Sequence, residues 1–286
     1  DRSATAVPAH VKPHSAEDYF ERGLAAYQCG DLDGAVREFD RAIEFATRYL
    51  PGVPYVGTIG FFNPEAAPLF YNRGLVHYDQ QHWEAAQHDL EDALNLDPTY
   101  VTAWIKLGNT HLNRGAYDEA IKQFNQALKL DPRAVLAWNN RGLARQQQGD
   151  TDGALADYEQ VLKLAPHSPS ALNNRAGIKH DRGDLRGALT DYDAAIAADA
   201  TLAFVFNNRG VTRKTLGDLR GALADYNEAI RLRPAFANAY FNRSAVYKAL
   251  GKGAEAEADF VKSLTLRDAP AAQLEPPVEQ VKADKP

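Results

Sequence analysis

The sequence contains no methionine and a single cysteine, Cys29. One cysteine excludes a disulfide within the chain and a metal site built from several cysteines. Because a lone cysteine is more often a small buried hydrophobe than a reactive thiol, we expect Cys29 to be buried. The absence of methionine indicates that residue 1 is not a translation start, so a leader removed earlier is one expectation for this chain.

Two further absences narrow the class of protein. No run approaches the roughly 18 consecutive apolar residues of a membrane-spanning helix. No segment is rich in Lys and Arg, and the net charge is −6, so we do not expect nucleic acid as the main partner. With 45% hydrophobic and 24% charged residues, the composition is typical of a soluble globular protein. The compartment stays open between the cytoplasm and, if a leader was removed, bacterial export to the periplasm or beyond.

The chain repeats itself every 34 residues. The sequence Trp-Asn-Asn-Arg-Gly at 138–142 returns in altered form at 172–176, 206–210 and 240–244. Such a period predicts a solenoid of stacked, similar units rather than two ordinary domains. We number positions within each repeat from its first residue. These first residues are Ala16, Ala67, Val101, Val135, Pro169, Ala203 and Ala237.

Each repeat is predicted to be helix, tight turn, helix. Glycine at position 15 allows the first helix to end in a left-handed residue, and an Asp that follows in four repeats can cap the next helix. The glycines are Gly30, Gly115, Gly149, Gly183, Gly217 and Gly251. Position 20 is always Ala and position 24 always a large apolar residue, as expected where two helices pack closely. Proline at position 32 ends the second helix in four repeats.

One repeat carries a full set of family-typical residues: Trp104, Leu107, Gly108, Tyr117, Ala120, Phe124, Ala127 and Pro132. Together they resemble the tetratricopeptide repeat. The resemblance implies an all-α fold, an α–α superhelix or solenoid of about seven helix–turn–helix repeats, with the first helix of each pair lining a concave groove. It also implies a binding scaffold rather than a catalyst, although the fold alone does not choose the ligand.

The resemblance divides the chain into three parts. We expect a disordered N-terminal segment at 1–15, the solenoid at 16–270 and a disordered tail at 271–286. The repeats are expected at 16–49, 67–100, 101–134, 135–168, 169–202, 203–236 and 237–270. An insertion at 50–66 contains three Pro, three Gly and three aromatic residues, which argues against a helix. It is either a tolerated loop packed by its own aromatic residues or a flap over one end of the groove.

Arginine occupies position 7 in six repeats, and an acid occupies position 23 in the same six. Repeat three departs at both positions together, with Leu107 and Gln123. This joint departure predicts that the two positions form a partly buried ion pair across each helix pair, and that breaking one pair strands a charge. The expected pairs are Arg22–Glu38, Arg73–Asp89, Arg141–Asp157, Arg175–Asp191, Arg209–Asp225 and Arg243–Asp259.

Asparagine recurs at position 6, although it is a poor helix former. By the family resemblance this position faces the groove, where an amide supplies both a donor and an acceptor to an extended peptide. The alternative is that these amides serve hydrogen bonding between repeats alone. The candidate groove residues are Asn72, Lys106, Asn140, Asn174, Asn208 and Asn242 at position 6, Tyr71, Asn139, Asn173 and Asn207 at position 5, and Tyr78, Lys214 and Lys248 at position 12.

Positions 5 and 12 change in character along the chain. Both are aromatic in the first two repeats and polar in the middle. Near the end position 12 is basic, where Lys179 and Arg213 at position 11 add to the basic character, while position 5 returns to an aromatic residue, Phe241. Either a ligand apolar at one end and acidic at the other fits this gradient, or the repeats have simply drifted. The family's carboxylate clamp for chaperone tails requires basic residues at positions 2 and 6 of one repeat, and that pattern is not met.

The sequence offers little for catalysis or metal binding. It contains no Gly-rich phosphate loop, no nucleophile motif and no H-E-x-x-H spacing. His77 and His111 share position 11, where packing against the partner helix is the expected role. We therefore predict no enzyme, no cofactor and no metal. The predicted function is a scaffold or adaptor that binds an extended peptide segment of another protein. The alternative is a self-associating assembly factor, exported in a bacterium, that acts through its uncapped C-terminal repeat.

Overall fold

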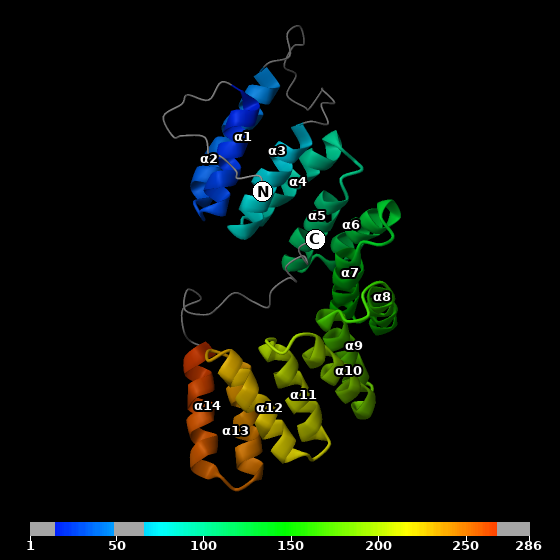
Figure 1. The fold of residues 1–286 in the computed structure, drawn as a ribbon, viewed down its shortest axis with the longest axis vertical. Coiled ribbons are helices and arrows are strands. Elements are labelled where there is room, and N and C mark those ends of the chain that lie inside the picture. The colour runs from blue at the N-terminus through cyan, green and yellow to red at the C-terminus, as the bar shows by residue number, and fades with distance from the viewer. Residues whose placement is uncertain (1–14, 49–65, 268–286) are drawn as a thin grey trace. The chain divides into compact units, whose positions relative to one another are not determined.

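The computed structural model describes residues 15–48 and 66–267, and this part of the chain contains 14 α-helices and no strand (Figure 1). The predicted all-α fold of helix–turn–helix repeats is confirmed. The predicted insertion and terminal segments lie outside the described residues, apart from Ser15 and Ala66, and stay predictions. No helix among the described residues is long and apolar enough to cross a membrane.

The chain divides into two compact units, residues 1–149 and 150–286. The helices of the first unit are α1 (Ala16–Gln28), α2 (Leu32–Arg48), α3 (Ala67–Asp79), α4 (Trp83–Leu96), α5 (Val101–Asn113), α6 (Tyr117–Leu130) and α7 (Val135–Gln148). Those of the second unit are α8 (Thr151–Leu164), α9 (Pro169–Asp181), α10 (Leu185–Ala198), α11 (Ala203–Thr215), α12 (Leu219–Leu232), α13 (Ala237–Ala249) and α14 (Gly253–Arg267).

The helix ends follow the predicted signals. Ser15 and Asp18 form a reciprocal capping box at the start of α1, with backbone-to-side-chain distances of 3.1 and 3.0 Å. Asp184 accepts a hydrogen bond from the Gly187 amide at 2.9 Å, and the other three predicted Asp caps behave alike. These bonds satisfy amides that a helix start leaves without partners.

The turn within each repeat uses a left-handed residue at position 15. All six glycines predicted there have φ between 73° and 89°. In the second repeat the position is filled by Gln81, whose φ is 59°. A side chain in this conformation is strained, since Cβ approaches the following carbonyl.

The core runs between the two helices of each pair. Position 20 is fully buried in six repeats, and position 24 in the same six is at most 2% exposed. Each of these large side chains contributes roughly 1.5–3 kcal/mol by burial. At position 8 of the third repeat, a Cβ on Gly108 would lie 2.5 Å from the Phe124 ring, so glycine allows this close approach.

The expected burial of Cys29 is wrong, because the side chain is exposed. Cys29 is the C-cap of α1 and precedes Gly30 in the turn. The same position is occupied by Arg114, Gln148 and Arg182 in other repeats, which are also exposed. The turn, rather than the residue type, decides its exposure.

Candidate functional site

Within each unit the first helices of successive repeats lie side by side, and we call the surface that they form the first-helix face of that unit. In the first unit α1, α3, α5 and α7 contact each other in sequence, and in the second unit α9, α11 and α13 do so. Within each unit the second helices pack against the first helices of their own and the following repeat. Positions 5, 6 and 12 therefore lie where neighbouring first helices meet.

The asparagines of the second unit form a continuous chain of hydrogen bonds, which we call the Asn zipper. Within a repeat, Asn173 Nδ2 donates to Asn174 Oδ1 at 3.2 Å and Asn207 Nδ2 donates to Asn208 Oδ1 at 3.2 Å. Between repeats, Asn208 Nδ2 donates to Asn173 Oδ1 at 3.0 Å and Asn242 Nδ2 donates to Asn207 Oδ1 at 3.0 Å. Position 5 of one repeat is thus fastened to position 6 of the next.

The two positions of the zipper differ in exposure. Asn173 and Asn207 at position 5 are 8% and 7% exposed, whereas Asn174, Asn208 and Asn242 at position 6 are half-buried. An amide has two N–H donors and two acceptor lone pairs. Asn208 uses one N–H and one lone pair of its side-chain amide in the zipper. One N–H and one lone pair of this half-buried side chain remain for a ligand.

The first unit continues the pattern with different partners. Asn139 Nδ2 donates to Asn140 Oδ1 at 3.0 Å, and Asn140 Nδ2 donates to Asn109 Oδ1 at 2.8 Å. Asn109 is buried and occupies position 9, which holds no other asparagine, so no repeated pattern pointed to it. Asn72 bonds within its own helix instead, from Nδ2 to the Pro68 carbonyl at 2.7 Å.

The aromatic candidates of the first unit are less open than a groove lining requires. Tyr78 is 7% exposed, and its hydroxyl accepts a hydrogen bond from Asn113 Nδ2 at 2.6 Å. The ammonium group of Lys106 lies 4.3 Å from the Tyr78 ring centroid. Burial lowers the pKa of Lys106, and the charge of nearby Asp79 opposes that shift. Tyr71 stacks on the Tyr100 ring at 4.7 Å between centroids.

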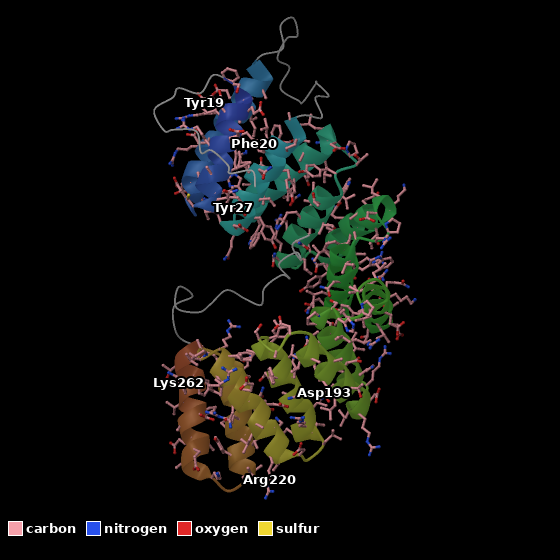
Figure 2. The ribbon with its side chains drawn as sticks, viewed as in Figure 1. Tyr19, Phe20, Tyr27, Asp193, Arg220 and Lys262 are labelled. Atoms are coloured by element: carbon pink, nitrogen blue, oxygen red, sulfur yellow. The ribbon has the colours of Figure 1, made fainter. Side chains whose placement is uncertain are left out.

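Position 12 faces the first helix of the next repeat. Tyr27, labelled in Figure 2, donates a short hydrogen bond to Asp79, and His180 Nδ1 lies 3.0 Å from Thr212 Oγ1. Both contacts join a position-12 side chain to the following first helix. Lys214 and Lys248 occupy the same position in α11 and α13.

Lys179 and Arg213, expected to add to the basic end of the groove, have a structural partner instead. Lys179 Nζ lies 2.8 Å from Asp191 Oδ2, and Arg213 Nη1 lies 2.9 Å from Asp225 Oδ2. Position 11 reaches the second helix of its own repeat, so these cations neutralise buried carboxylates.

The predicted arginine–acid pairs are present in five repeats. Arg175 holds both carboxylate oxygens of Asp191, each at 2.8 Å. Equivalent pairs are Arg73–Asp89, Arg209–Asp225 and Arg243–Asp259, and Arg22 lies 3.4 Å from Glu38. The sixth expected pair, Arg141–Asp157, has one residue in each unit and stays a prediction.

The Asp191 carboxyl shows how these pairs act on protonation. Burial raises its pKa, but the hydrogen bonds and charges of Arg175 and Lys179 outweigh burial and hold the pKa below its usual range. This carboxyl is therefore charged, and it ties two cations of α9 to α10.

Metal chemistry finds no support in the described residues, where no three His, Cys, Asp or Glu side chains are placed to hold an ion. His77 Nε2 lies 3.8 Å from Asp89, and His111 is buried with its pKa lowered by burial. Both geometries fit the predicted packing role.

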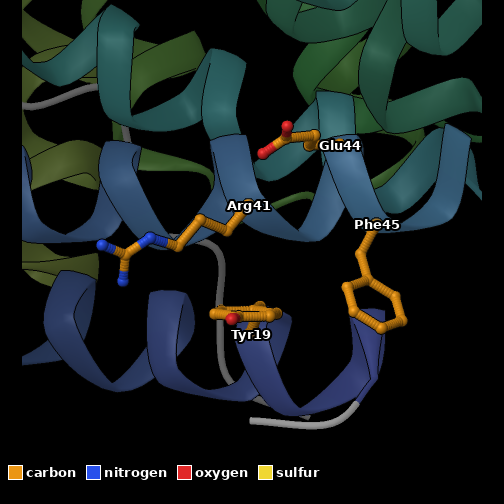
Figure 3. Close-up of a pocket in the computed structure, with 4 residues that line it drawn as sticks. All are labelled: Tyr19, Arg41, Glu44 and Phe45. Atoms are coloured by element: carbon orange, nitrogen blue, oxygen red, sulfur yellow. The ribbon is translucent and has the colours of Figure 1, made fainter. Parts of the chain in front are cut away.

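A pocket of about 300 Å³ lies between α1 and α2 and was not predicted (Figure 3). Tyr19, Arg41, Glu44 and Phe45 line it. Arg41 Nη1 already lies 2.9 Å from Glu38, and α2 is a second helix. We assign no ligand to this pocket.

Comparison with known families gives matches over most of the repeats. A model described as tetratricopeptide repeat matches residues 71–135, 105–169 and 139–203. A second model, described as TPR repeat, matches 213–251, and a third, again a tetratricopeptide repeat, matches 237–270. A comparison with curated proteins gave no match.

Solved structures agree with these matches. A tetratricopeptide repeat protein from Parabacteroides merdae aligns with a TM-score of 0.70 at 21% identity, over 88% of this chain and 93% of that one. PilF from Pseudomonas aeruginosa aligns with a TM-score of 0.63 at 19% identity, over 78% and 94%. A chain of the APC/C hetero-tetramer Cut9–Hcn1 aligns with a TM-score of 0.68 at 17% identity, over 89% of this chain but 47% of that one. At these identities the likeness shows the fold alone.

Proposed function

Because this chain belongs to the tetratricopeptide-repeat family, we propose that it is a protein–protein interaction scaffold whose first-helix faces bind an extended segment of a partner protein. Members of this family are generally non-catalytic scaffolds that bind other proteins. The partner segment and the residues that hold it are our proposal.

The observation that carries the proposal is the ordered state of the Asn zipper. Asn208 is fixed by Asn173 and Asn207 and still has one N–H and one lone pair to offer. An extended peptide presents a carbonyl and an amide of the same kind along its backbone. Since the side chain is already ordered, binding costs little additional rotamer entropy.

The residues that we propose to contact the peptide come from the set predicted from the sequence. Their exposure in the structure decides which of them touch the peptide and which support those that do. The position-6 residues of the zipper hold the peptide backbone, and the buried position-5 residues support them. In the first unit, Asn140 acts in the same way, while Lys106 supplies a cation above Tyr78.

The test measures binding of fluorescent twelve-residue peptides to the full chain by anisotropy. Asn174→Ala and Asn208→Ala, combined, are expected to weaken binding at least tenfold, since two backbone contacts of about 1 kcal/mol each are lost. Asn95→Ala, an exposed asparagine on α4, is the matched control and should bind as the wild type does. Equal affinity of the double variant, with helicity unchanged by circular dichroism, would rule out the zipper as the binding surface.

A second candidate function is self-association through the last repeat. Phe241 and Phe260 are 42% and 43% exposed, whereas their counterparts in the preceding repeat, Asn207 and Tyr226, are buried. The two rings lie 6.3 Å apart, and Phe241 stands at the position where Asn207 bonds to the next repeat. A second copy of the chain could cover them with the same apolar surface.

Light scattering over a wide concentration range decides this alternative. A dimer that dissociates on Phe260→Asp would support self-association. A monomer at every concentration would exclude it and leave the scaffold proposal unaffected.

A further inference from the structure

The charges of the second unit are sorted by helix. α9, α11 and α13 contain seven Lys or Arg residues and one acid, Asp181. Five of the seven are committed to buried carboxylates: Arg175 and Lys179 to Asp191, Arg209 and Arg213 to Asp225, and Arg243 to Asp259. The two that stand outside these pairs are Lys214 and Lys248.

Neither lysine has an ion pair or hydrogen bond with any described residue. In earlier repeats a position-12 side chain meets a polar group on the next first helix, as Tyr27 meets Asp79 and His180 meets Thr212. The residues of α13 that correspond to those partners are Val246 and Ala249. Neither can accept a hydrogen bond from the Lys214 ammonium group through its side chain.

Lys214 and Lys248 follow the half-buried amides of the zipper on the same two helices. Asn208 and Lys214 are six residues apart on α11, and Asn242 and Lys248 are six apart on α13. Six residues advance about 9 Å along a helix and turn about 240° around it, so each lysine lies further along its helix than its amide and about a third of a turn around from it. Neither lysine has a counter-ion among the described residues.

We infer that the first-helix face of the second unit selects a partner segment with acidic side chains, whose carboxylates contact Lys214 and Lys248 while Asn208 and Asn242 hold the backbone. This inference rests on the proposed function and specifies its partner. Neighbouring helices pack about 8–10 Å apart, and an extended chain advances about 3.3–3.6 Å per residue. Two acids three residues apart would therefore reach the two lysines together.

A protein segment fits this face better than nucleic acid does. A backbone of phosphates needs a row of cations, and this face offers two that are not already paired. The amides of the zipper match the carbonyl and N–H groups of a peptide. The chain as a whole carries a net charge of −6, which would repel a polyanion.

The experiment uses the full chain and three extended, Ser/Thr-based twelve-residue peptides: two Glu three residues apart, two adjacent Glu, and both Glu replaced by Gln. We expect the three-residue spacing to bind tightest, with a gain over the Gln peptide of about two- to fivefold for each lysine engaged. Lys214→Gln with Lys248→Gln should remove that gain. Lys163→Gln with Lys262→Gln, at exposed lysines on the second helices α8 and α14, removes the same charge as a matched control and should keep the gain; Figure 2 labels Lys262.

The outcomes separate the two proposals. If the Gln peptide binds as tightly as the Glu peptides and still depends on Asn208, the acidic-segment inference fails and the proposed function stands. If no peptide binds, both fail. If a twelve-nucleotide oligo(dT) binds more tightly than every peptide and loses affinity in the double lysine variant, the face reads nucleic acid and the inference is overturned.

Discussion

The side-chain nitrogen of Asn208 lies 3.0 Å from Asn173 Oδ1 and donates a hydrogen bond across the boundary between two repeats. Asn173 is buried, so this bond is part of the folded protein before any ligand arrives. The recurring asparagines therefore do structural work at position 5. We propose that the asparagines at position 6 also bind a partner segment, and the binding experiment tests this.

Replacing Asn173 by Ala is expected to lower the free energy of unfolding by about 1–3 kcal/mol, because Asn174 Oδ1 and Asn208 Nδ2 each lose the hydrogen bond that they make with it. Urea unfolding followed by circular dichroism measures the loss. Adding Asn208→Ala should cost less than the sum of the two single changes, since the partner that was stranded is then absent. A loss under about 0.5 kcal/mol for Asn173→Ala, as expected for an exposed site such as Asn95, would contradict a structural role.

The arginine pairs were predicted with their partners, whereas for the asparagines hydrogen bonding between repeats was only one of two alternatives and its partners were not predicted. Leu107 and Gln123 depart together in repeat three, and such a joint change identifies two positions that touch. The zipper joins positions 35 residues apart in different repeats. Its register depends on how one repeat rotates onto the next, and a period of 34 residues in the sequence does not contain that rotation.

The roles of Lys179 and Arg213 were missed for a related reason. Packing against the partner helix was expected at position 11 for His77 and His111, but the two basic residues at this position were added to the groove because of their charge. Their long side chains extend instead to Asp191 and Asp225 on the second helix, where buried carboxylates attract a second cation. Sequence alone gives the position of a residue on the helix but not the direction of a flexible side chain.

The buried carboxylates differ in the number of cations that bind them. Removing one arginine should therefore lower the free energy of unfolding by different amounts in different repeats. Asp89 is 2% exposed and is bound by Arg73 at 2.5 and 2.9 Å, with His77 as a distant neighbour. Arg73→Met should cost about 3–5 kcal/mol, because it strands a buried charge. Arg209→Met should cost less, since Arg213 still binds Asp225. The two unfolding curves test this order, and a larger loss for Arg209→Met would contradict it.

The pKa of Asp191 predicts how stability depends on pH. Its folded-state pKa lies below the unfolded value of about 3.9. Ionised Asp191 therefore contributes stability that is fully present above that unfolded value and is lost as pH falls through the folded value. Lys179→Met removes one of the two cations and raises the folded pKa, so acid unfolding should begin at a higher pH.

Circular dichroism between pH 7 and pH 2 follows this shift. Lys163→Met, at an exposed lysine on α8, is the matched control and should unfold at the wild-type pH. If both lysine variants unfold at the same pH, the contact with Lys179 does not lower the pKa of the Asp191 carboxyl.

Gln81, the left-handed residue in the turn of the second repeat, allows the cost of backbone strain to be measured. Gln81 has φ of 59° at a position where six other repeats have glycine. The conformation costs a non-glycine residue about 1–2 kcal/mol, and the greater freedom of glycine in the unfolded chain returns about 0.5–1 kcal/mol of that. Gln81→Gly is therefore expected to stabilise the first unit by about 0.5–1 kcal/mol.

The reverse change at Gly183 is the matched control. A Cβ built on Gly183, with φ of 83°, meets no atom within 4 Å, so Gly183→Gln introduces conformational strain without a clash. It should destabilise the second unit by a similar amount, measured by urea unfolding. A loss of stability in Gln81→Gly would mean instead that the Gln81 side chain makes a contact worth more than the strain that its backbone carries.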